Sequence, residues 1–219
     1  HRTIGGVGEN KNETTGPAKI YKNECRKDMD EAGRLARVDF SVQTIYNGSR
    51  QVVDIFAGDI VDAYRTACHK ANKHFRTKVA RNADVVVVNG FPQNAQPFNG
   101  MHWARRCLRD GGSVVLVTQY SPGIESLHYM RDRWNYEPSL LWDAKIGRGP
   151  LKYAGQFIIY SGTMPARDRG FFPSGTHFEN RWEDVVARLQ KAHRRDSSVA
   201  VYPHGPLQHP PIEIDGSLT

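Results

Sequence analysis

The pattern of apolar residues along the chain predicts several strands buried inside a sheet. Val85–Val88 are four consecutive valines with no polar alternation, which is typical of a parallel strand covered by helices on both faces. Three further apolar runs predict strands of the same kind. They read "SVVLVTQY", "GQFIIYSG" and "SSVAVYPHGP" and begin at Ser113, Gly155 and Ser197.

Between these runs, apolar residues recur at the spacing of amphipathic helices. Helices are predicted from Glu24 to Ala36, from Asp59 as a cap to about Phe75, and from about Phe98 to Leu108, with "RDGG" as the turn after the third. Two more are predicted in "SPGIESLHYMRDRW" and "RWEDVVARLQKAH". A strand, a helix and a second strand in succession imply a right-handed parallel crossover.

The stretch "VDFSVQTIYNGSRQVVDIFAG" has two β-rich halves around Asn47-Gly48, which predicts an antiparallel hairpin. The ending "LQHPPIEIDGSLT" contains two adjacent prolines and predicts an extended tail. The alternation of strands and helices places the chain in the α/β class. We therefore expect a mixed sheet with parallel strand-helix-strand crossovers and a β-hairpin, and with helices on both faces.

Composition narrows the class of protein only slightly. Of the 219 residues 39% are hydrophobic, and Lys plus Arg (30) exceed Asp plus Glu (23), so anionic partners are favoured in general. The longest apolar runs are far shorter than the ~20 residues that cross a bilayer, and no signal segment opens the chain. We expect a soluble, cytoplasmic protein with no membrane partner. Its three cysteines form no disulfide framework.

The predicted helix after the valine strand presents a polar face. At 100° per residue, Asn99, His102 and Arg106 lie within about 60° of one another, on a helix that begins beside the carboxyl end of a strand. Ligands of open parallel sheets bind at that edge, and a helix amino terminus favours a carboxylate or a phosphate. Gly90 brings flexible backbone to the same edge. The alternative is a solvated face without function.

Other patterns are less specific. "GGVGEN" at Gly5 to Asn10 has neither a strand before it nor a helix after it, so it is a poor dinucleotide loop. No catalytic triad can be identified from spacing. The residues alone therefore indicate an α/β domain with an anion-accepting crevice.

Five stretches, in order and spacing, resemble the C-terminal half of the nickel-dependent lactate racemase (LarA-like) family. They are "VDFSVQTIYNGSRQVVDIFAGDIVDAYRTAC", "ADVVVVNGFPQNAQPFNGMHWA", "DGGSVVLVTQYSPG", "GQFIIYSG" and "VAVYPHGPLQHP". The resemblance implies a two-domain racemase or epimerase of 2-hydroxy acids. Its cofactor is a nickel-pincer nucleotide (nickel pyridinium-3,5-bisthiocarboxylic acid mononucleotide) that exchanges a hydride with the substrate's Cα. The catalytic histidines and the tethering lysine belong to the N-terminal domain, so this chain is expected to be inactive without it.

The resemblance also implies which residues meet the substrate. After the Gly90-Phe91-Pro92 turn, Phe98 occupies the family's aromatic position, Asn99 that of a glutamine and His102 that of a lysine. Asparagine is one methylene shorter than glutamine, and histidine is titratable where lysine carries a lasting charge. Gly90, Phe98, Asn99 and His102 are therefore the predicted substrate-binding residues, for a 2-hydroxy acid other than lactate.

The resemblance also bears on the amino-terminal residues. His1 falls near the place of a nickel-coordinating histidine of the family, so the resemblance implies a metal ligand there; a tag remnant or an unrelated histidine is the alternative. We expect residues 1–22 to be an irregular interdomain segment and residues 23–219 to form the C-terminal α/β domain, which partners its own N-terminal domain.

Two other functions are alternatives. A Rossmann-like NAD-dependent oxidoreductase would need a glycine fingerprint directly after a strand, and none is found. A non-catalytic module that binds anions or nucleic acid is the third hypothesis, but no nucleic-acid recognition motif or cluster of aromatic and basic residues supports it.

Overall fold

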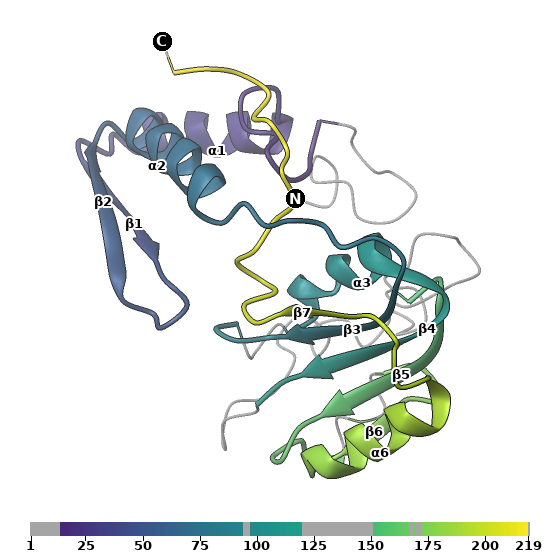
Figure 1. The fold of residues 1–219 in the computed structure, drawn as a ribbon. Helices are drawn as coiled ribbons and strands as arrows, with labels where there is room; N and C mark the ends of the chain where they lie inside the picture. The colour runs from purple at the N-terminus through teal and green to yellow at the C-terminus, as the bar shows by residue number, and fades with distance from the viewer. Residues whose placement is uncertain (1–13, 94–96, 120–150, 167–168, 170–171, 219) are drawn as a thin grey trace. The chain divides into compact units, whose positions relative to one another are not determined.

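The computed structural model describes residues 14–93, 97–119, 151–166, 169 and 172–218. The chain divides into two compact units, which we treat separately (Figure 1). Unit 1 comprises residues up to Thr77 together with those from His209 onward, and unit 2 comprises Lys78–Gln208. Among the described helices, none is long and apolar enough to cross a membrane. The helix predicted in "SPGIESLHYMRDRW" lies outside the described residues.

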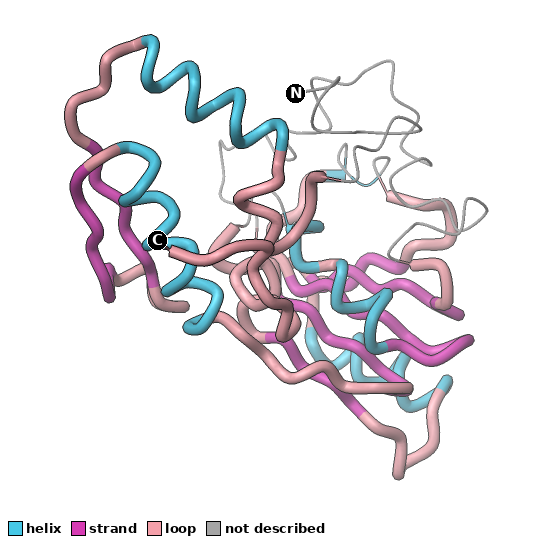
Figure 2. The backbone as a smooth tube through the Cα atoms, turned by 90° about the horizontal axis from the view of Figure 1, so that it is seen from above, coloured by secondary structure: helices cyan, strands magenta, loops and turns pink. Residues whose placement is uncertain are grey.

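Unit 2 is built on a parallel sheet of five strands. The strands are β3 (Ala83–Asn89), β4 (Leu108–Val117), β5 (Ala154–Tyr160), β6 (His177–Glu179) and β7 (Val199–Tyr202). Their order is β6-β5-β4-β3-β7, and every neighbouring pair is parallel. Figure 2 shows them running side by side. The predicted α/β class and parallel crossovers are confirmed.

The valine strand is buried on both faces, as its sequence predicts. Val86 and Val88 belong to the larger apolar cluster, which includes Ala104 and Cys107 of α3 (His102–Cys107). Val85 and Val87 belong to a second cluster with Val185 of α6 (Trp182–Ala192). Helices therefore cover both faces of the sheet (Figure 1).

One detail of the predicted sheet is corrected. The hairpin does not join the parallel strands: it forms a two-stranded sheet of its own in unit 1, so the large sheet is wholly parallel rather than mixed. The hairpin suggests a mixed sheet because it is antiparallel. The sequence of a hairpin does not show, however, whether its strands also pair with strands elsewhere in the chain.

The helix predicted from Phe98 to Leu108 is also shorter than expected. A 3-10 turn, η2 (Pro97–Gly100), comes first, then α3 with six residues, and β4 already begins at Leu108. The predicted turn "RDGG" is the first part of β4. Gly100 explains the break, because a Cβ atom there would lie 2.8 Å from Val88 Cγ1 and 2.9 Å from the Gly205 carbonyl carbon. The backbone is thus pressed against β3 before the α-helix begins.

At the amino ends of the strands, Asp84 of β3 binds one residue on each neighbouring side. Its carboxylate pairs with Arg109 of β4 and accepts hydrogen bonds of 2.8 Å from both the N–H and the hydroxyl of Ser198, just before β7. The hydrogen bond from Arg109, followed by those from Ser198, lowers the pKa of the Asp84 carboxyl.

Unit 1 contains two helices and the hairpin. Asn23 caps α1 (Glu24–Leu35), and Asp59 caps α2 (Ile60–His74) by accepting from the N–H groups of Val61 and Asp62. Strands β1 (Ser41–Tyr46) and β2 (Val52–Gly58) form the predicted hairpin. Its turn spans residues 47–51 and is closed by a hydrogen bond from the Asn47 N–H to the Gln51 carbonyl, so it is longer than two residues.

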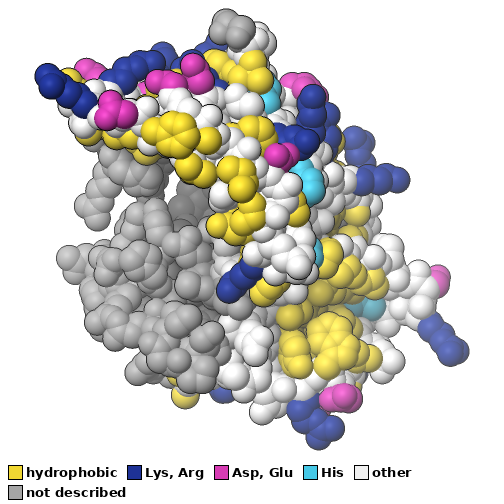
Figure 3. Space-filling model, turned by 90° about the vertical axis from the view of Figure 1, so that its left-hand side faces the viewer, with side chains coloured by type: hydrophobic (Ala, Val, Ile, Leu, Met, Phe, Trp, Pro, Cys, Tyr) yellow, Lys and Arg dark blue, Asp and Glu magenta, His cyan; other side chains and the backbone are white. Residues whose placement is uncertain are grey.

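The hairpin contacts α2 along one face, and its other face is exposed and apolar. Val42 and Ile55 are 57% and 62% exposed, while Ile45 on the covered face is only 4% exposed. On the face that Figure 3 draws, hydrophobic side chains gather in patches between Lys and Arg side chains. Such a face lowers solubility unless something covers it.

The C-terminal segment, residues 209–218, belongs to unit 1. His209 donates its N–H to the Phe75 carbonyl and accepts from the Thr77 N–H, which makes a single parallel bridge with Arg76. Further on, Asp215 accepts hydrogen bonds of 2.8–2.9 Å from the backbone N–H groups of Ile20, Tyr21 and Lys22. Burial alone would raise the pKa of Asp215, but these N–H groups outweigh it and lower the pKa.

Candidate functional site

The candidate site lies at the carboxyl ends of β3 and β7. Gly90 directly follows β3, is buried, and donates its N–H to the Val117 carbonyl at 2.8 Å. The Asn89 side chain accepts from the Phe91 N–H at 3.1 Å, and the Asn89 carbonyl accepts from the Gly205 N–H at 3.0 Å. Asn89 therefore holds the loops after β3 and after β7 against each other.

A chain of hydrogen bonds runs from Gly90 to His102. The Gly90 carbonyl accepts from the Gln93 N–H at 2.9 Å, and the Gln93 side-chain oxygen accepts from the Asn99 amide at 2.8 Å. The Asn99 carbonyl lies 3.0 Å from His102 Nδ1. Because a carbonyl only accepts, Nδ1 carries the proton, so in the neutral imidazole the lone pair is on Nε2. The structure thus brings Gly90, Asn99 and His102 together.

The loop after β7 adds a second histidine to this edge. His204 follows Tyr202 and Pro203, and its ring centroid lies 6.0 Å from that of Phe91. Its Nδ1 is buried, and no described residue offers it a hydrogen-bond partner. Its backbone N–H donates to the Gln208 side chain at 3.0 Å, which fixes the loop. The close packing of Gly100 on Gly205 brings this loop up against η2.

The neighbouring strands also end in hydroxyl residues. Thr118 follows β4 and Ser161 follows β5, and both side chains are buried. Thr118 Oγ1 has no hydrogen-bond partner among the described residues. Hydroxyl, amide and imidazole groups therefore lie at one edge of the sheet, and such polar groups suit hydroxyl and carboxylate oxygens.

The other predicted site residues are placed less fully. Phe98 lies within η2, but its side chain is outside the described part, and so is His1. Arg106 is exposed on α3. With only six residues, α3 offers little of the helix dipole that was expected to favour anions here. Asn99 is exposed and His102 half-buried.

Sequence reasoning missed Gln93, Thr118 and His204 as members of this edge. A usable signal existed for two of them, because Thr118 and His204 stand at the carboxyl ends of apolar runs, where parallel strands place ligand-binding residues. Gln93 had no such signal, since its role depends on how the loop after β3 folds back toward Asn99.

No group of three or more His, Cys, Asp or Glu side chains that could hold a metal ion occurs in the part of the chain that the structure describes. The described residues therefore do not fit a nickel site by themselves, and we derive no reaction step through the metal.

Fold and site together define an α/β protein with a group of polar side chains at the carboxyl edge of a parallel sheet. Comparison with known proteins shows which proteins the chain is similar to. No protein-family model matches the chain. It is 28% identical over 103 residues to the lactate racemase of Lactiplantibacillus plantarum, which covers 45% of this chain and 24% of that protein. It is 27% identical over 109 residues to the lactate racemase of Thermoanaerobacterium thermosaccharolyticum, with 48% and 25% covered.

The fold has a counterpart among solved structures. The lactate racemase apoprotein of T. thermosaccharolyticum aligns with a TM-score of 0.61 and 18% identity, over 85% of this chain and 49% of that chain. The resemblance to lactate racemases, which are isomerases, is thus confirmed over about half of the sequence. The matches span about a quarter of the curated relatives and about half of the solved chain.

Proposed function

We propose that this chain forms the substrate-side wall of a racemase or epimerase that acts on a 2-hydroxy acid other than lactate. A second, N-terminal domain would supply the catalytic histidines and the tethering lysine and hold the nickel-pincer nucleotide, which provides the hydride chemistry at Cα when bound. The observation that carries the proposal is the hydrogen-bonded series Gly90–Gln93–Asn99–His102 at the carboxyl edge of β3, in the segment that resembles lactate racemases.

The substrate preference rests on two departures from the family pattern. Asn99 reaches less far than glutamine, and its amide already donates to Gln93. His102 replaces a long, charged lysine by a shorter ring whose Nδ1 faces the Asn99 carbonyl. Both side chains are shorter than the family's residues, and the shortening leaves room for an acid bulkier than lactate.

His204 is proposed to contact the same substrate. It joins His102 at this edge of the sheet, and a bound hydroxyl or carboxylate group would give its imidazole a hydrogen-bond partner.

The nicotinamide alternative gains no support from the site. A dinucleotide needs a tight glycine turn that leads straight from a strand into a long helix. Here residues 90–101 separate β3 from α3, and α3 has only six residues.

The test uses the two-domain protein in which this chain follows a domain with the catalytic residues, loaded with the cofactor. Racemisation of a panel of 2-hydroxy acids is followed by chiral chromatography. We expect bulkier acids to have a higher kcat/KM than lactate, and His204→Asn to raise KM for the preferred acid. His74→Asn, which changes an exposed histidine of unit 1, is the matched control.

A preference for lactate would contradict the substrate assignment. If no 2-hydroxy acid is racemised by the loaded two-domain protein, the proposed function itself is wrong.

A further inference from the structure

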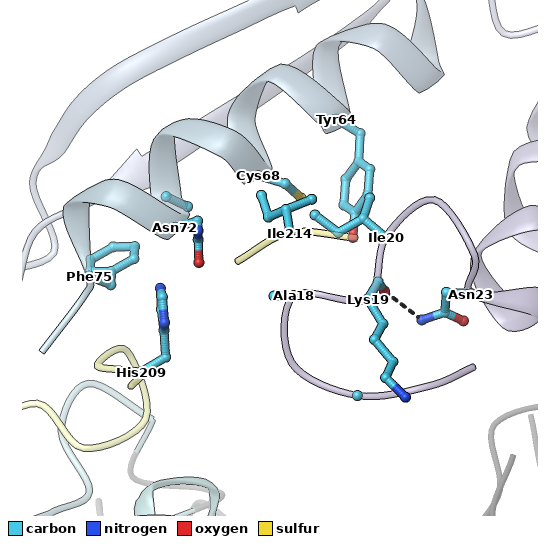
Figure 4. Close-up of a pocket in the computed structure, with 12 residues that line it drawn as sticks. Ala18, Lys19, Ile20, Asn23, Tyr64, Cys68, Asn72, Phe75, His209 and Ile214 are labelled. Carbon is cyan, nitrogen blue, oxygen red and sulfur yellow. Dashed lines mark hydrogen bonds between the residues drawn. The ribbon is translucent and has the colours of Figure 1, made fainter. Parts of the chain in front are cut away.

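A pocket of about 300 Å³ lies within unit 1 (Figure 4). It is formed by α2, by residues 16–23 and by the C-terminal segment. Its apolar lining consists of Ala18, Ile20, Ala71, Phe75 and Ile214. This volume is at the lower end for small-molecule sites, which are mostly apolar with a few placed polar groups.

His209 presents a hydrogen-bond acceptor to this pocket. Its backbone is fixed to the end of α2 by the bonds to Phe75 and Thr77. Its Nδ1 lies 2.6 Å from the Pro210 carbonyl, which only accepts, so Nδ1 carries the proton. In the neutral ring Nε2 is therefore an acceptor. It is buried, and none of the described residues gives it a partner.

Asn72 presents a second acceptor. Its amide nitrogen donates to the Ile212 carbonyl at 3.2 Å, which assigns the orientation of the side chain and leaves its oxygen as the pocket-facing atom. In Figure 4 this oxygen and the outer edge of the His209 ring point into the same part of the pocket, beside Phe75. The C-terminal segment thus accepts a hydrogen bond from one N–H of each side chain and leaves both acceptors to a ligand.

The opposite end of the pocket is lined by the phenol of Tyr64, the thiol of Cys68 and the side chain of Lys19. Burial raises the pKa of the Tyr64 phenol to about 12 and also raises the pKa of the Cys68 thiol. Both groups are therefore neutral at pH 7. Lys19 is the cationic side chain among the lining residues, and in Figure 4 its ammonium lies away from Asn72 and His209.

We propose that this pocket binds a small neutral molecule with an apolar, ring-sized body and one hydroxyl or N–H donor, which is received by His209 Nε2 and Asn72 Oδ1. A carboxylate or phosphate is disfavoured, because it would meet acceptors at the Asn72 end, and a buried acceptor facing another acceptor is costly. The proposal does not depend on the proposed racemase function.

The test follows binding of two ring compounds of nearly the same size to the ¹⁵N-labelled chain by NMR. The first, p-cresol, carries a hydroxyl donor, and the second, 4-fluorotoluene, carries fluorine in its place. We expect saturable shifts of the Asn72 side-chain amide and of the His209 ring with p-cresol, with a Kd below ~1 mM. 4-Fluorotoluene should bind about tenfold more weakly, because it leaves both acceptors without a donor.

Variants distinguish the effect of the hydrogen-bond acceptors on binding from the effect of the cavity volume. His209→Phe should reduce the difference between the two compounds to less than about threefold, since the acceptor that distinguishes them is lost. Ala71→Leu should weaken both compounds alike by filling the space, and it keeps the test decisive if His209→Phe does not fold. Lys73→Gln, at an exposed position near the end of α2, should change neither.

Equal affinity for the two compounds in the unchanged protein, or no saturable shift with p-cresol up to its solubility limit, would overturn the assignment.

Discussion

At the scale of single residues, the chemistry of the candidate site depends on which ring nitrogen of His102 carries the proton. Nδ1 of His102 faces a carbonyl and is protonated in either charge state, so a change of charge takes place at Nε2. If His102 takes the place of the family's lysine, as proposed, its recognition of an anion should depend on pH, whereas recognition by a lysine would not.

The first prediction concerns this replacement. If His102 meets the substrate's carboxylate, KM for the acid should rise as pH increases through the imidazole range, because an unperturbed imidazole titrates near ~6.5 and an ammonium only near ~10. His102→Lys should flatten the dependence of KM on pH between about 6 and 9. The measurement is a pH series of KM for the loaded two-domain protein. An unchanged profile in the variant would remove His102 from the substrate site, and His74→Lys serves as the control.

The second prediction concerns Asp84, at the opposite ends of the strands. Because its pKa is lowered in the folded protein, its contribution to stability is present above the unfolded pKa of about 3.9 and is lost as pH falls through the folded value. Asp84→Asn should therefore lower the unfolding midpoint at pH 7, and the difference from the unchanged protein should shrink below about pH 4. Urea unfolding at several pH values measures it. A difference that does not vary with pH would show that the carboxylate charge is not the cause.

At the scale of elements, α3 is short but firmly anchored. Trp103 is fully buried, and its ring stacks on Tyr202 of β7 with centroids 4.0 Å apart. The Tyr202 hydroxyl in turn lies 2.9 Å from Cys107 Sγ and accepts from the Ala80 N–H at 3.2 Å. A six-residue helix has little stability of its own, so this packing holds α3 in place and with it His102.

The third prediction tests that anchor. Trp103→Ala should lower the free energy of unfolding of unit 2 by about 3–5 kcal/mol, the usual cost of emptying a tryptophan site in a core. Trp182, at the start of α6, is 40% exposed, and Trp182→Ala should cost clearly less. Denaturant unfolding followed by near-UV circular dichroism gives both values. Similar losses in the two variants would contradict the anchoring role.

Helices and strands that are determined by neighbouring residues in the sequence could be predicted. Four valines specify β3, and Asp59 marks the start of α2 because its side chain accepts from N–H groups two and three residues on. The break in the helix at Gly100 was not predictable, because its cause is contact with Val88 and Gly205. His204 follows an apolar run and could have been suspected from that, but its place beside Phe91 depends on the pairing of β7 with β3.

At the scale of the whole molecule, the chain enters unit 1, leaves it for unit 2 and returns. The Asp215 contact with Ile20 spans 195 positions of sequence, and no local pattern announces such a pairing. The proline-rich ending was expected to be extended, and residues 209–218 indeed form no helix, but their binding to the start of unit 1 was outside any prediction from the sequence.

The fourth prediction follows from this return. Asp215→Ala should increase hydrogen exchange of the Ile20, Tyr21 and Lys22 amides several-fold, because it removes the acceptor of all three. Amides of β3 and β4 in unit 2 should keep their protection and provide the internal reference. Faster exchange throughout both units would show a global loss of stability instead.

The return of the C-terminal segment has a consequence for biosynthesis. Domains usually fold in the order in which the ribosome releases them, the first one first. Unit 1 cannot follow that order, because Asp215 and His209 are translated only after all of unit 2. The nascent chain should therefore complete the parallel sheet while residues 14–77 still lack their last partners, and unit 1 should become native after unit 2 although most of it is translated earlier.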